Sequence, residues 1–301
     1  MHLVTFLEID SNDDKRSRIG LLDRDHREVV DLSQCGSHLP SNMQGLLDLG
    51  EAAFPAMKQA LSQNIGRLSV DTVKFLAPVP RPLRNILCVG KNYPDHVKEV
   101  QSVVASKSDN KGEAPAQPIF FTKATTSVIG PNEPIPAWLD ETESVDYEGE
   151  LAVVIGQGGR GISADAAMQH VYGYTIVNDV TSRRLQKQHQ QWFLGKSLDG
   201  FCPMGPSLVT RDEIPDVTKL RVQTHVNDEL RQNGVVGEML FDIPTLIATL
   251  SKSMTLQTGD IIATGTPAGV GMGFRPPRFL KNGDRVSIAI EPIGTLENPV
   301  E

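Results

Sequence analysis

Hydrophobic and polar positions alternate in short runs along most of this 301-residue chain. Runs rich in Val, Ile and aromatic residues, bounded by turn residues, predict strands. These strands are expected at residues 3–9, 18–22, 28–32, 84–89, 119–122, 127–129, 150–155, 172–178, 208–210, 221–226, 261–264 and 285–290. Helical spacing of apolar residues predicts helices at 43–61, 93–104, 164–172, 182–191 and 243–250. Many short strands with few helices between them indicate a β-rich α+β fold.

A proline-rich segment at residues 77–83 interrupts this pattern and indicates an extended linker. The three strands and the helix expected before this segment predict a small N-terminal α+β domain over residues 1–72. The elements after it predict a larger β-rich domain over residues 73–301, which is long enough to bury its own core.

The composition narrows the class of protein. A formal net charge of −8 argues against a nucleic-acid partner and offers no attraction to an anionic membrane surface. Three widely spaced cysteines (Cys35, Cys88 and Cys202) favour reduced thiols over a disulfide framework. The N-terminus lacks the pattern of a signal peptide, and no apolar run is long enough to span a bilayer. We therefore expect a soluble cytoplasmic protein with no membrane partner.

Three carboxylates stand at the ends of two predicted apolar strands. Glu148 and Glu150 are two positions apart and so share one face of a strand, and Asp179 joins them if the strands are neighbours. Such crowding is costly to bury unless a cation binds, and oxygen ligands suit Mg²⁺, Mn²⁺ or Ca²⁺. The alternative is that the two glutamates form the solvent face of a half-buried strand, which is the commoner situation for Glu.

Two glycine-containing segments resemble nucleotide-binding motifs. Residues 156–161 match Gly-x-Gly-x-x-Gly, but the predicted helix starts after the glycines, so a plain turn between strand and helix is the favoured interpretation. Gly195-Lys196-Ser197 resembles the end of a phosphate-binding loop, yet Gln190 stands where the first glycine of that loop belongs. Lys196 remains a candidate as a lone cation among apolar residues, against the alternative of a surface lysine.

His96 and Glu99 are three positions apart on a predicted helix and share one face, which is suitable for a general base oriented by a carboxylate. The alternative is an incidental pair on an exposed helix. Thr266 lies in a glycine-rich segment after a strand, where its hydroxyl is available to a carboxylate; a tight turn is the simpler reading. His170, His189 and Trp192 have no informative spacing and are interpreted as structural.

Together these segments resemble the fumarylacetoacetate hydrolase family. The resemblance covers about residues 80–300, and it rests on several motifs in the family's order, at residues 88–99, 147–152, 178–179, 195–206, 258–271 and 280–286. It implies the family's β-rich roll, which is usually dimeric, and members often carry a small N-terminal domain. We therefore expect a homodimer.

The resemblance also implies roles for single residues. Glu148, Glu150 and Asp179 would hold one Mg²⁺ or Mn²⁺ per chain, with Lys196 beside the metal and the substrate. His96 would be the base, oriented by Glu99, on a segment that orders as a lid, and the loop from about residue 102 to 117 is expected to close with it. Thr266 would bind the substrate carboxylate. One departure is Arg184, which stands where the family commonly has an acid.

Family members cleave C–C bonds of acylpyruvates, decarboxylate oxaloacetate, or isomerise and hydrate dienoic acids, all through an enolate of a small 2-oxo acid. The motifs favour slightly a metal-dependent hydrolase of a 2,4-dioxo acid. Oxaloacetate decarboxylation and hydroxymuconate-type isomerisation or hydration stay open as alternatives. A non-catalytic ligand-binding protein on the same scaffold also stays open, although binding alone needs neither a base nor a paired lysine.

Overall fold

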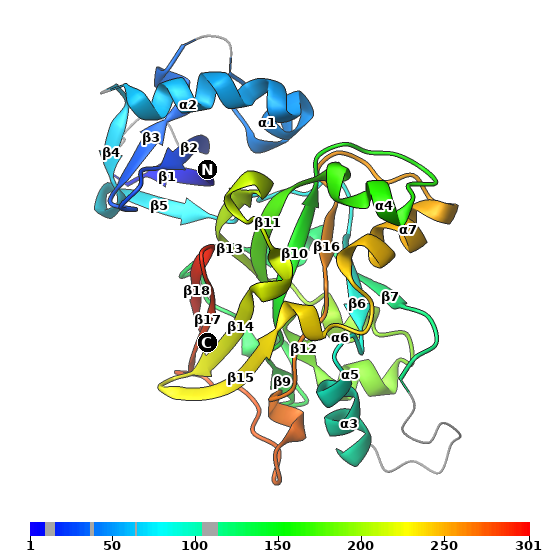
Figure 1. Ribbon diagram of the computed structural model, residues 1–301. Helices are drawn as coiled ribbons and strands as arrows, with labels where there is room; N and C mark the ends of the chain where they lie inside the picture. The colour runs from blue at the N-terminus through cyan, green and yellow to red at the C-terminus, as the bar shows by residue number, and fades with distance from the viewer. Residues whose placement is uncertain (10–15, 37–38, 64, 104–113) are drawn as a thin grey trace.

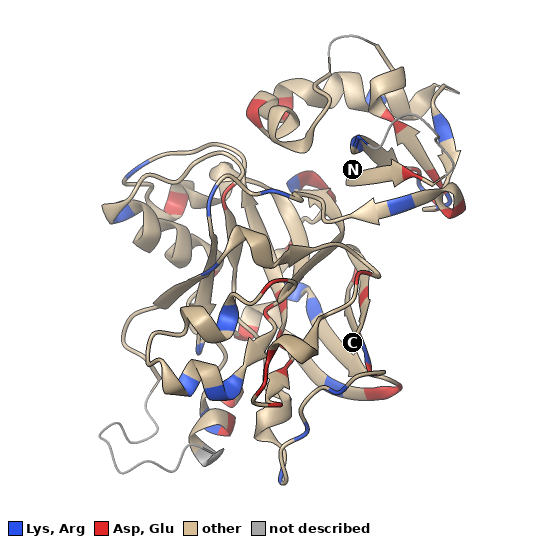
Figure 2. Cartoon of the chain, turned by 180° about the vertical axis from the view of Figure 1, so that it is seen from behind, with Lys and Arg blue, Asp and Glu red and all other residues tan. Residues whose placement is uncertain are grey.

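A computed structural model describes residues 1–9, 16–36, 39–63, 65–103 and 114–301 (Figure 1). The predicted strand-rich α+β fold is confirmed. Within these residues the strands form one sheet of twelve strands, one of four and one of two, and all three sheets are open. Acidic and basic positions are interspersed over the described part of the chain (Figure 2).

The N-terminal part forms one end of the twelve-stranded sheet. Its strands are β1 (His2–Glu8), β2 (Arg18–Leu22), β3 (Glu28–Asp31), β4 (Arg67–Ser69) and β5 (Val73–Leu76), and its helices are α1 (Met43–Leu49) and α2 (Phe54–Ser62). The side chain of Asn42 caps α1 by accepting from the amide of Gly45. Gly50, at φ 56°, ends the helix in a conformation that favours glycine.

The same sheet continues into the larger part of the chain, where β1 pairs with β13. Its order from that point is β1-β13-β11-β10-β16-β6-β7, with β8 beside β13. These strands are β6 (Ile86–Gly90), β7 (Ile119–Lys123), β8 (Val128–Ile129), β10 (Gly149–Ile155), β11 (Val171–Asn178), β13 (Cys202–Thr210) and β16 (Ile261–Ala263). Every residue of β10 and β11 is buried, as expected for central strands covered on both faces.

The four-stranded sheet covers one face of these central strands. It runs β15 (Glu229–Val235), β14 (Arg221–Val226), β17 (Arg285–Ile290) and β18 (Gly294–Pro299). Its buried Val222 and Ile288 join Leu151 and Ile176 of the main sheet in one hydrophobic cluster. The two sheets approach closely at Gly149, where a Cβ would lie 2.2 Å from Thr224 Oγ1. No other residue fits there without a shift.

The remaining elements close the end of β10 and β11 that lies away from the N-terminal part (Figure 1). They are the two-stranded pair β9 (Val145–Asp146) and β12 (Thr181–Ser182), with helices α3 (Pro94–Val103), α5 (Arg183–Gln188) and α6 (Phe193–Lys196). Helices α4 (Ala164–Ala167) and α7 (Ile243–Ser253) pack together on another side of the sheet. Among the described residues, no helix has both the length and the apolar character needed to cross a membrane.

The domain boundary between residues 72 and 73 stays a prediction. The observed sheet is continuous across it, because β5 pairs with β1 and β1 pairs with β13. A hydrophobic cluster also spans both parts, joining Leu46 and Met57 to Val154 and Leu208.

Several elements differ from the sequence prediction in extent. The single helix expected over 43–61 is two helices separated at Gly50. The helix expected over 164–172 ends by His170, and β11 begins at Val171 because the following β-branched and aromatic residues pair with β10. Strand β13 starts at Cys202 instead of residue 208, and β15 and β18 were not predicted.

Candidate active site

The three carboxylates predicted as metal ligands converge in the structure. Strands β10 and β11 pair with Gly149 opposite Asn178, which places Glu148 and Asp179 side by side at the end of the ladder. The amide of Asp179 donates to Glu148 O (2.8 Å), and the amide of Glu148 donates to Asn178 Oδ1 (3.0 Å). One carboxylate oxygen from each of Glu148, Glu150 and Asp179 lies within 4.8 Å of the others, and all three residues are buried.

Lys196, for which the family resemblance implies a place beside the metal, lies among these carboxylates. It ends helix α6, and its Nζ donates to Glu148 Oε2 and Asp179 Oδ2, both at 2.7 Å. The ammonium also lies 5.0 Å from the centre of the Phe121 ring. Burial alone would lower the pKa of Lys196, but the carboxylates of Asp179 and Glu148 raise it above its usual value. Lys196 is therefore a buried cation and not a surface lysine.

A second buried lysine, Lys123, was not predicted. It ends β7, is fully buried, and donates from Nζ to Asp179 Oδ1 (2.7 Å), to Val180 O (3.0 Å) and to Lys196 O. It therefore holds Asp179 and the end of α6 in one arrangement. The only available sequence signal was a lysine closing the apolar run 119–122, and such a lysine is usually exposed.

Arg183 is the third cation of the site and was also missed as a site residue. Its Nε donates to Asp146 Oδ2 (2.8 Å), and its Nη1 lies 2.6 Å from Glu148 Oε1. Its Nη2 is buried and has no hydrogen-bond partner among the described residues. The neighbouring Arg184, which departs from the family pattern, is exposed, and its amide donates to Ser144 Oγ. The departure therefore lies outside the carboxylate cluster.

The environments of Glu148 and Glu150 shift their pKa values in opposite directions. For Glu148, burial alone would raise the pKa, but Lys196 and Arg183 outweigh it and hold the pKa well below its usual value. For Glu150, burial and the charges of Asp179 and Glu148 raise the pKa well above its usual value. Among the described residues its one hydrogen bond comes from the amide of Gly265 (2.8 Å). Glu150 is thus the carboxylate that most lacks a cation.

His96 and Glu99 form the predicted pair on α3. His96 Nδ1 lies 3.1 Å from Glu99 Oε2, and His96 is only 6% exposed, so the pair is not an incidental surface contact. The other oxygen of Glu99 accepts from the amide of Gly269 (3.0 Å). The imidazole lies near enough to Glu148 to lower its pKa, after Lys196 and Arg183. Helix α3 therefore places a histidine at the carboxylate cluster and is itself held by the glycine-rich loop.

Thr266 is buried at the site, but its hydroxyl is engaged inward. It donates to Gly149 O (3.0 Å) and accepts from Gln232 Nε2 (2.6 Å). Gln232 also accepts from the amide of Gly149 (2.9 Å) and donates to Pro267 O (2.8 Å). A substrate carboxylate would have to displace one of these bonds, so the binding role of Thr266 stays a prediction.

The segment 156–161, which matches Gly-x-Gly-x-x-Gly, forms a turn between a strand and a helix. The amides of Gly159 and Gly161 donate to Leu256 O (2.9 Å) and Ser251 O (2.7 Å), so these groups are occupied by the chain itself. Trp192 packs edge-on against Phe121, which supports its structural interpretation. Most of the predicted lid, residues 104–113, lies outside the described residues.

The three buried carboxylates, two of which have unequal pKa values, form a donor set that fits a hard divalent cation. A histidine paired with a glutamate lies beside them. All first ligands would be carboxylate oxygens, and Glu150 lacks a cationic partner. The residues present therefore fit Mg²⁺ or Mn²⁺.

Comparison with known proteins shows that the chain is similar to one protein family and to several named relatives. Residues 85–301 match the family described as fumarylacetoacetate (FAA) hydrolase C-terminal. The chain is 53% identical over 232 residues to oxaloacetate tautomerase YisK of Bacillus subtilis, covering 77% of this chain and 74% of the relative. It is 42% identical over 302 residues to the mitochondrial oxaloacetate tautomerase fahd2 of Xenopus laevis, covering 100% of this chain and 90% of the relative.

Two solved structures share the fold over the full chain. A fumarylacetoacetate hydrolase from Exiguobacterium antarcticum is 43% identical, with a TM-score of 0.83, and the match covers 100% of this chain and 99% of that one. A maleylpyruvate hydrolase from Sphingobium, in complex with manganese(II) and pyruvate, is 31% identical, with a TM-score of 0.77, covering 100% and 98%.

Proposed function

The chain belongs to the fumarylacetoacetate hydrolase family, and on this premise we propose that it is a Mg²⁺- or Mn²⁺-dependent enzyme that interconverts the keto and enol forms of oxaloacetate. The observation that carries the proposal is the His96–Glu99 pair held at a buried triad of carboxylates. The choice of reaction is supported by two relatives that are named oxaloacetate tautomerases.

The charge of the site supports an anionic substrate. The triad and Asp146 carry four formal negative charges, and Lys123, Lys196 and Arg183 carry three positive ones. A divalent ion would leave this buried cluster with one excess positive charge. Because isolated charge is costly to bury, an anionic ligand such as a carboxylate is favoured over a neutral ligand.

Glu148, Glu150 and Asp179 would hold the metal ion, which when bound supplies Lewis-acid polarisation of the substrate's carboxylate and 2-oxo groups. Glu99 accepts from Nδ1–H of His96, which leaves Nε2 as the proton acceptor of the ring. Nε2 removes a proton from C3 of the keto acid and returns it to the 2-oxo oxygen, which gives the enol. The ammonium of Lys196 stabilises the negative charge that develops on that oxygen.

A second candidate is hydrolysis of the C–C bond of a 2,4-dioxo acid, the reaction that the sequence motifs slightly favour. It is supported by the likeness to the maleylpyruvate hydrolase whose structure holds manganese(II) and pyruvate. In this reaction His96 takes a proton from water, and the hydroxide attacks the 4-oxo carbon. The C3–C4 bond then breaks, and the pyruvate enolate leaves beside Lys196 and takes up a proton.

The test is a panel of substrates with Mg²⁺ or Mn²⁺. The decay of oxaloacetate enol is followed by its ultraviolet absorbance, and acylpyruvate cleavage is followed in parallel. We expect fast tautomerisation that a strong chelator abolishes and that His96→Ala reduces about 10²–10⁴-fold. Cleavage of acylpyruvates without tautomerase activity would favour the second candidate. If no member of the panel were turned over, the non-catalytic alternative would hold.

A further inference from the structure

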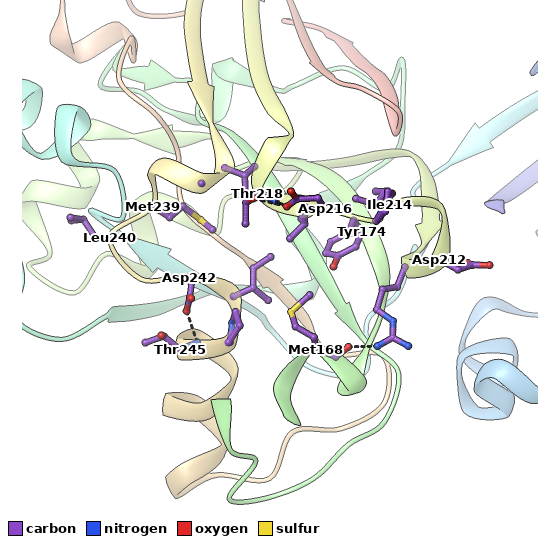
Figure 3. A pocket seen from close by; sticks show the side chains of 17 residues that line it. Met168, Tyr174, Asp212, Ile214, Asp216, Thr218, Met239, Leu240, Asp242 and Thr245 are labelled. Atoms are coloured by element: carbon purple, nitrogen blue, oxygen red, sulfur yellow. Dashed lines mark hydrogen bonds between the residues drawn. The ribbon is translucent and has the colours of Figure 1, made fainter. Parts of the chain in front are cut away.

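A cavity separate from the carboxylate site opens between β11, the segments 211–218 and 236–240, and the start of α7 (Figure 3). Its volume is about 950 Å³, large enough for a drug-sized molecule. Tyr174 of β11 lines it, and Asp179 directly follows the end of this strand, five residues later, so the cavity lies about 16 Å along the chain direction from the triad. None of the triad residues lines it.

The interior of the cavity has a distinct chemistry. Met168, Tyr174 and Met239 point toward one another across the hollow (Figure 3), and Ile214, Val217 and Ile243 add apolar surface. Thioethers pack well against aromatic rings and adapt to their shape. Tyr174 is fully buried, its hydroxyl points toward the hollow, and Figure 3 draws no hydrogen bond between it and the other residues of the lining. A buried hydroxyl of this kind is costly unless a ligand or water accepts from it.

The charges of the cavity disfavour an anion. Arg211 is the one cation among the described residues that line it, and both of its terminal nitrogens are occupied, by Met168 O and by Glu51. The lining also contains Asp212, Asp216 and Asp242. An oxo-acid substrate is therefore not suited to this cavity.

We propose that this cavity, defined by Met168, Tyr174 and Met239, is a second ligand site for a neutral aromatic molecule with a hydrogen-bond acceptor. The ring lies between the two thioethers, and the acceptor receives the Tyr174 hydroxyl. The apolar lining favours an aromatic ring, and the Tyr174 hydroxyl, which has no hydrogen bond to the rest of the lining, favours an acceptor. The lack of an available cation in the lining disfavours an anionic group.

The cavity wall is tied directly to the helix that carries His96. Leu240 of the lining donates through its amide to Asn92 O (2.8 Å), and the next residue, Phe241, exchanges two hydrogen bonds with the Asn92 side chain (2.8 and 3.0 Å). Asn92 also donates to Thr264 O (2.8 Å), beside the Gly265 amide that contacts Glu150. Helix α3 begins two residues after Asn92. A ligand that orders the wall therefore orders the start of α3, which makes the cavity an effector site.

The binding test uses prodan, a neutral naphthalene ketone whose emission shifts to the blue in apolar surroundings. We expect saturable one-to-one binding to the full chain. Tyr174→Phe removes only the hydroxyl and should weaken binding about 5-fold. Met239→Trp should fill the hollow and weaken binding at least 10-fold. The matched control is Tyr172→Phe, on the same strand but outside this cavity, which should bind as wild type does.

The coupling test uses hydrogen–deuterium exchange of α3 with and without saturating prodan. The bound probe should slow exchange of the α3 amides in wild type but not in Met239→Trp. Circular dichroism and thermal melts verify that each variant is folded. The site would be overturned if wild type showed no saturable binding. It would also be overturned if Tyr174→Phe and Met239→Trp both bound the probe as tightly as wild type does. Unchanged α3 exchange with the probe bound would overturn its role as an effector site.

Discussion

Single residues at the carboxylate site are held by a dense network of buried charges. Each of Glu148 and Asp179 has a lysine or arginine partner at 2.6–2.7 Å, whereas Glu150 has only a backbone amide. This asymmetry gives the two glutamates opposite pKa shifts. It also identifies Glu150 as the ligand whose ionisation depends most on a bound cation.

The first prediction concerns the proton that metal binding displaces from Glu150. Because the pKa of Glu150 is raised in the protein without an ion, this carboxyl group keeps a proton to higher pH than an ordinary glutamate does, and a divalent ion that binds it displaces that proton. Calorimetric titration with Mn²⁺ in buffers of different ionisation enthalpy should show proton release. Glu150→Gln should reduce the affinity for Mn²⁺ at least 10–100-fold and abolish the release. The exposed Glu141→Gln is the control, and retention of full affinity by Glu150→Gln would remove it from the ligand set.

The second prediction concerns Lys123. Lys123→Met leaves Asp179 Oδ1 and two buried carbonyls without their donor, so the free energy of unfolding should fall by about 3 kcal/mol. Affinity for Mn²⁺ should fall about 10–100-fold, because Asp179 loses the contact that orients it. Urea denaturation and Mn²⁺ titration measure the two effects, with the exposed Lys219→Met as control. Unchanged metal affinity would show that Lys123 supports only the fold.

At the scale of elements, the site depends on how helix α3 docks. Glu99 reaches across from α3 to the amide of Gly269 and packs over Gly273, where a Cβ would lie 2.1 Å from Glu99 Oε1. The glycines of this loop thus make room for the carboxylate that orients His96. Helix α3 can hold the base in place only while this contact is made.

The third prediction tests that contact. Gly273→Ala should push Glu99 away from His96 and reduce kcat about 10–100-fold, which is less than the ~10²–10⁴-fold expected for loss of the base itself, because His96 remains but is no longer oriented. The affinity for Mn²⁺ should stay within 2-fold, because none of the triad moves. Gly159→Ala, whose methyl would meet side-chain atoms no closer than 3.3 Å, is the control. A wild-type kcat in Gly273→Ala would show that the contact does not position the base.

At the scale of the whole molecule, the N-terminal part extends the twelve-stranded sheet whose strands β10 and β11 position the carboxylates. Strand β1 supplies one edge of β13, and the chain's N-terminal ammonium binds Thr210 and Glu213 of the larger part. His2 lies at this junction: its ring centroid is 4.4 Å from that of His26, with the ring planes tilted by 58°, and its Nδ1 is 3.3 Å from Ser207 Oγ. The two parts are therefore expected to unfold together.

The fourth prediction uses His2 as a reporter of this junction. Burial, followed by the charges of His26 and the N-terminus, lowers the pKa of His2 to about 4. Its unfolded-state pKa is near 6.5, so between pH 6.5 and 4 the unfolded chain binds the proton and the folded one does not. The contribution of His2 to stability is thus complete above pH 6.5 and declines as the pH falls toward 4.

The measurement is the melting temperature between pH 7 and pH 4. The fall in this range should be smaller for His2→Gln than for wild type, whereas the exposed His189→Gln should follow wild type. Equal slopes for His2→Gln and wild type would show that His2 titrates normally in the folded protein.

The sequence by itself determined the local part of this protein. Strands such as 221–226 and 285–290 were located to the residue, because alternating β-branched residues between turn residues leave few other conformations. Spacing placed His96 and Glu99 on one helix face, and the motif order identified the family. These properties depend on neighbours within a few residues, which a pattern records.

Only the tertiary structure decided those features that depend on contacts between residues far apart in the chain, namely the limits of some strands and the buried cations of the site. Strand β13 begins at Cys202 despite its prolines because β8, β11 and β1 surround it, and β18 forms because β17 offers it an edge. Lys123 and Arg183 entered the site because strands and helices far apart in the chain bring them to the carboxylates at a distance that no spacing encodes. The free energy of burying a charge depends on the partners that the fold brings to it, so only the tertiary structure shows which charged residues belong to the site.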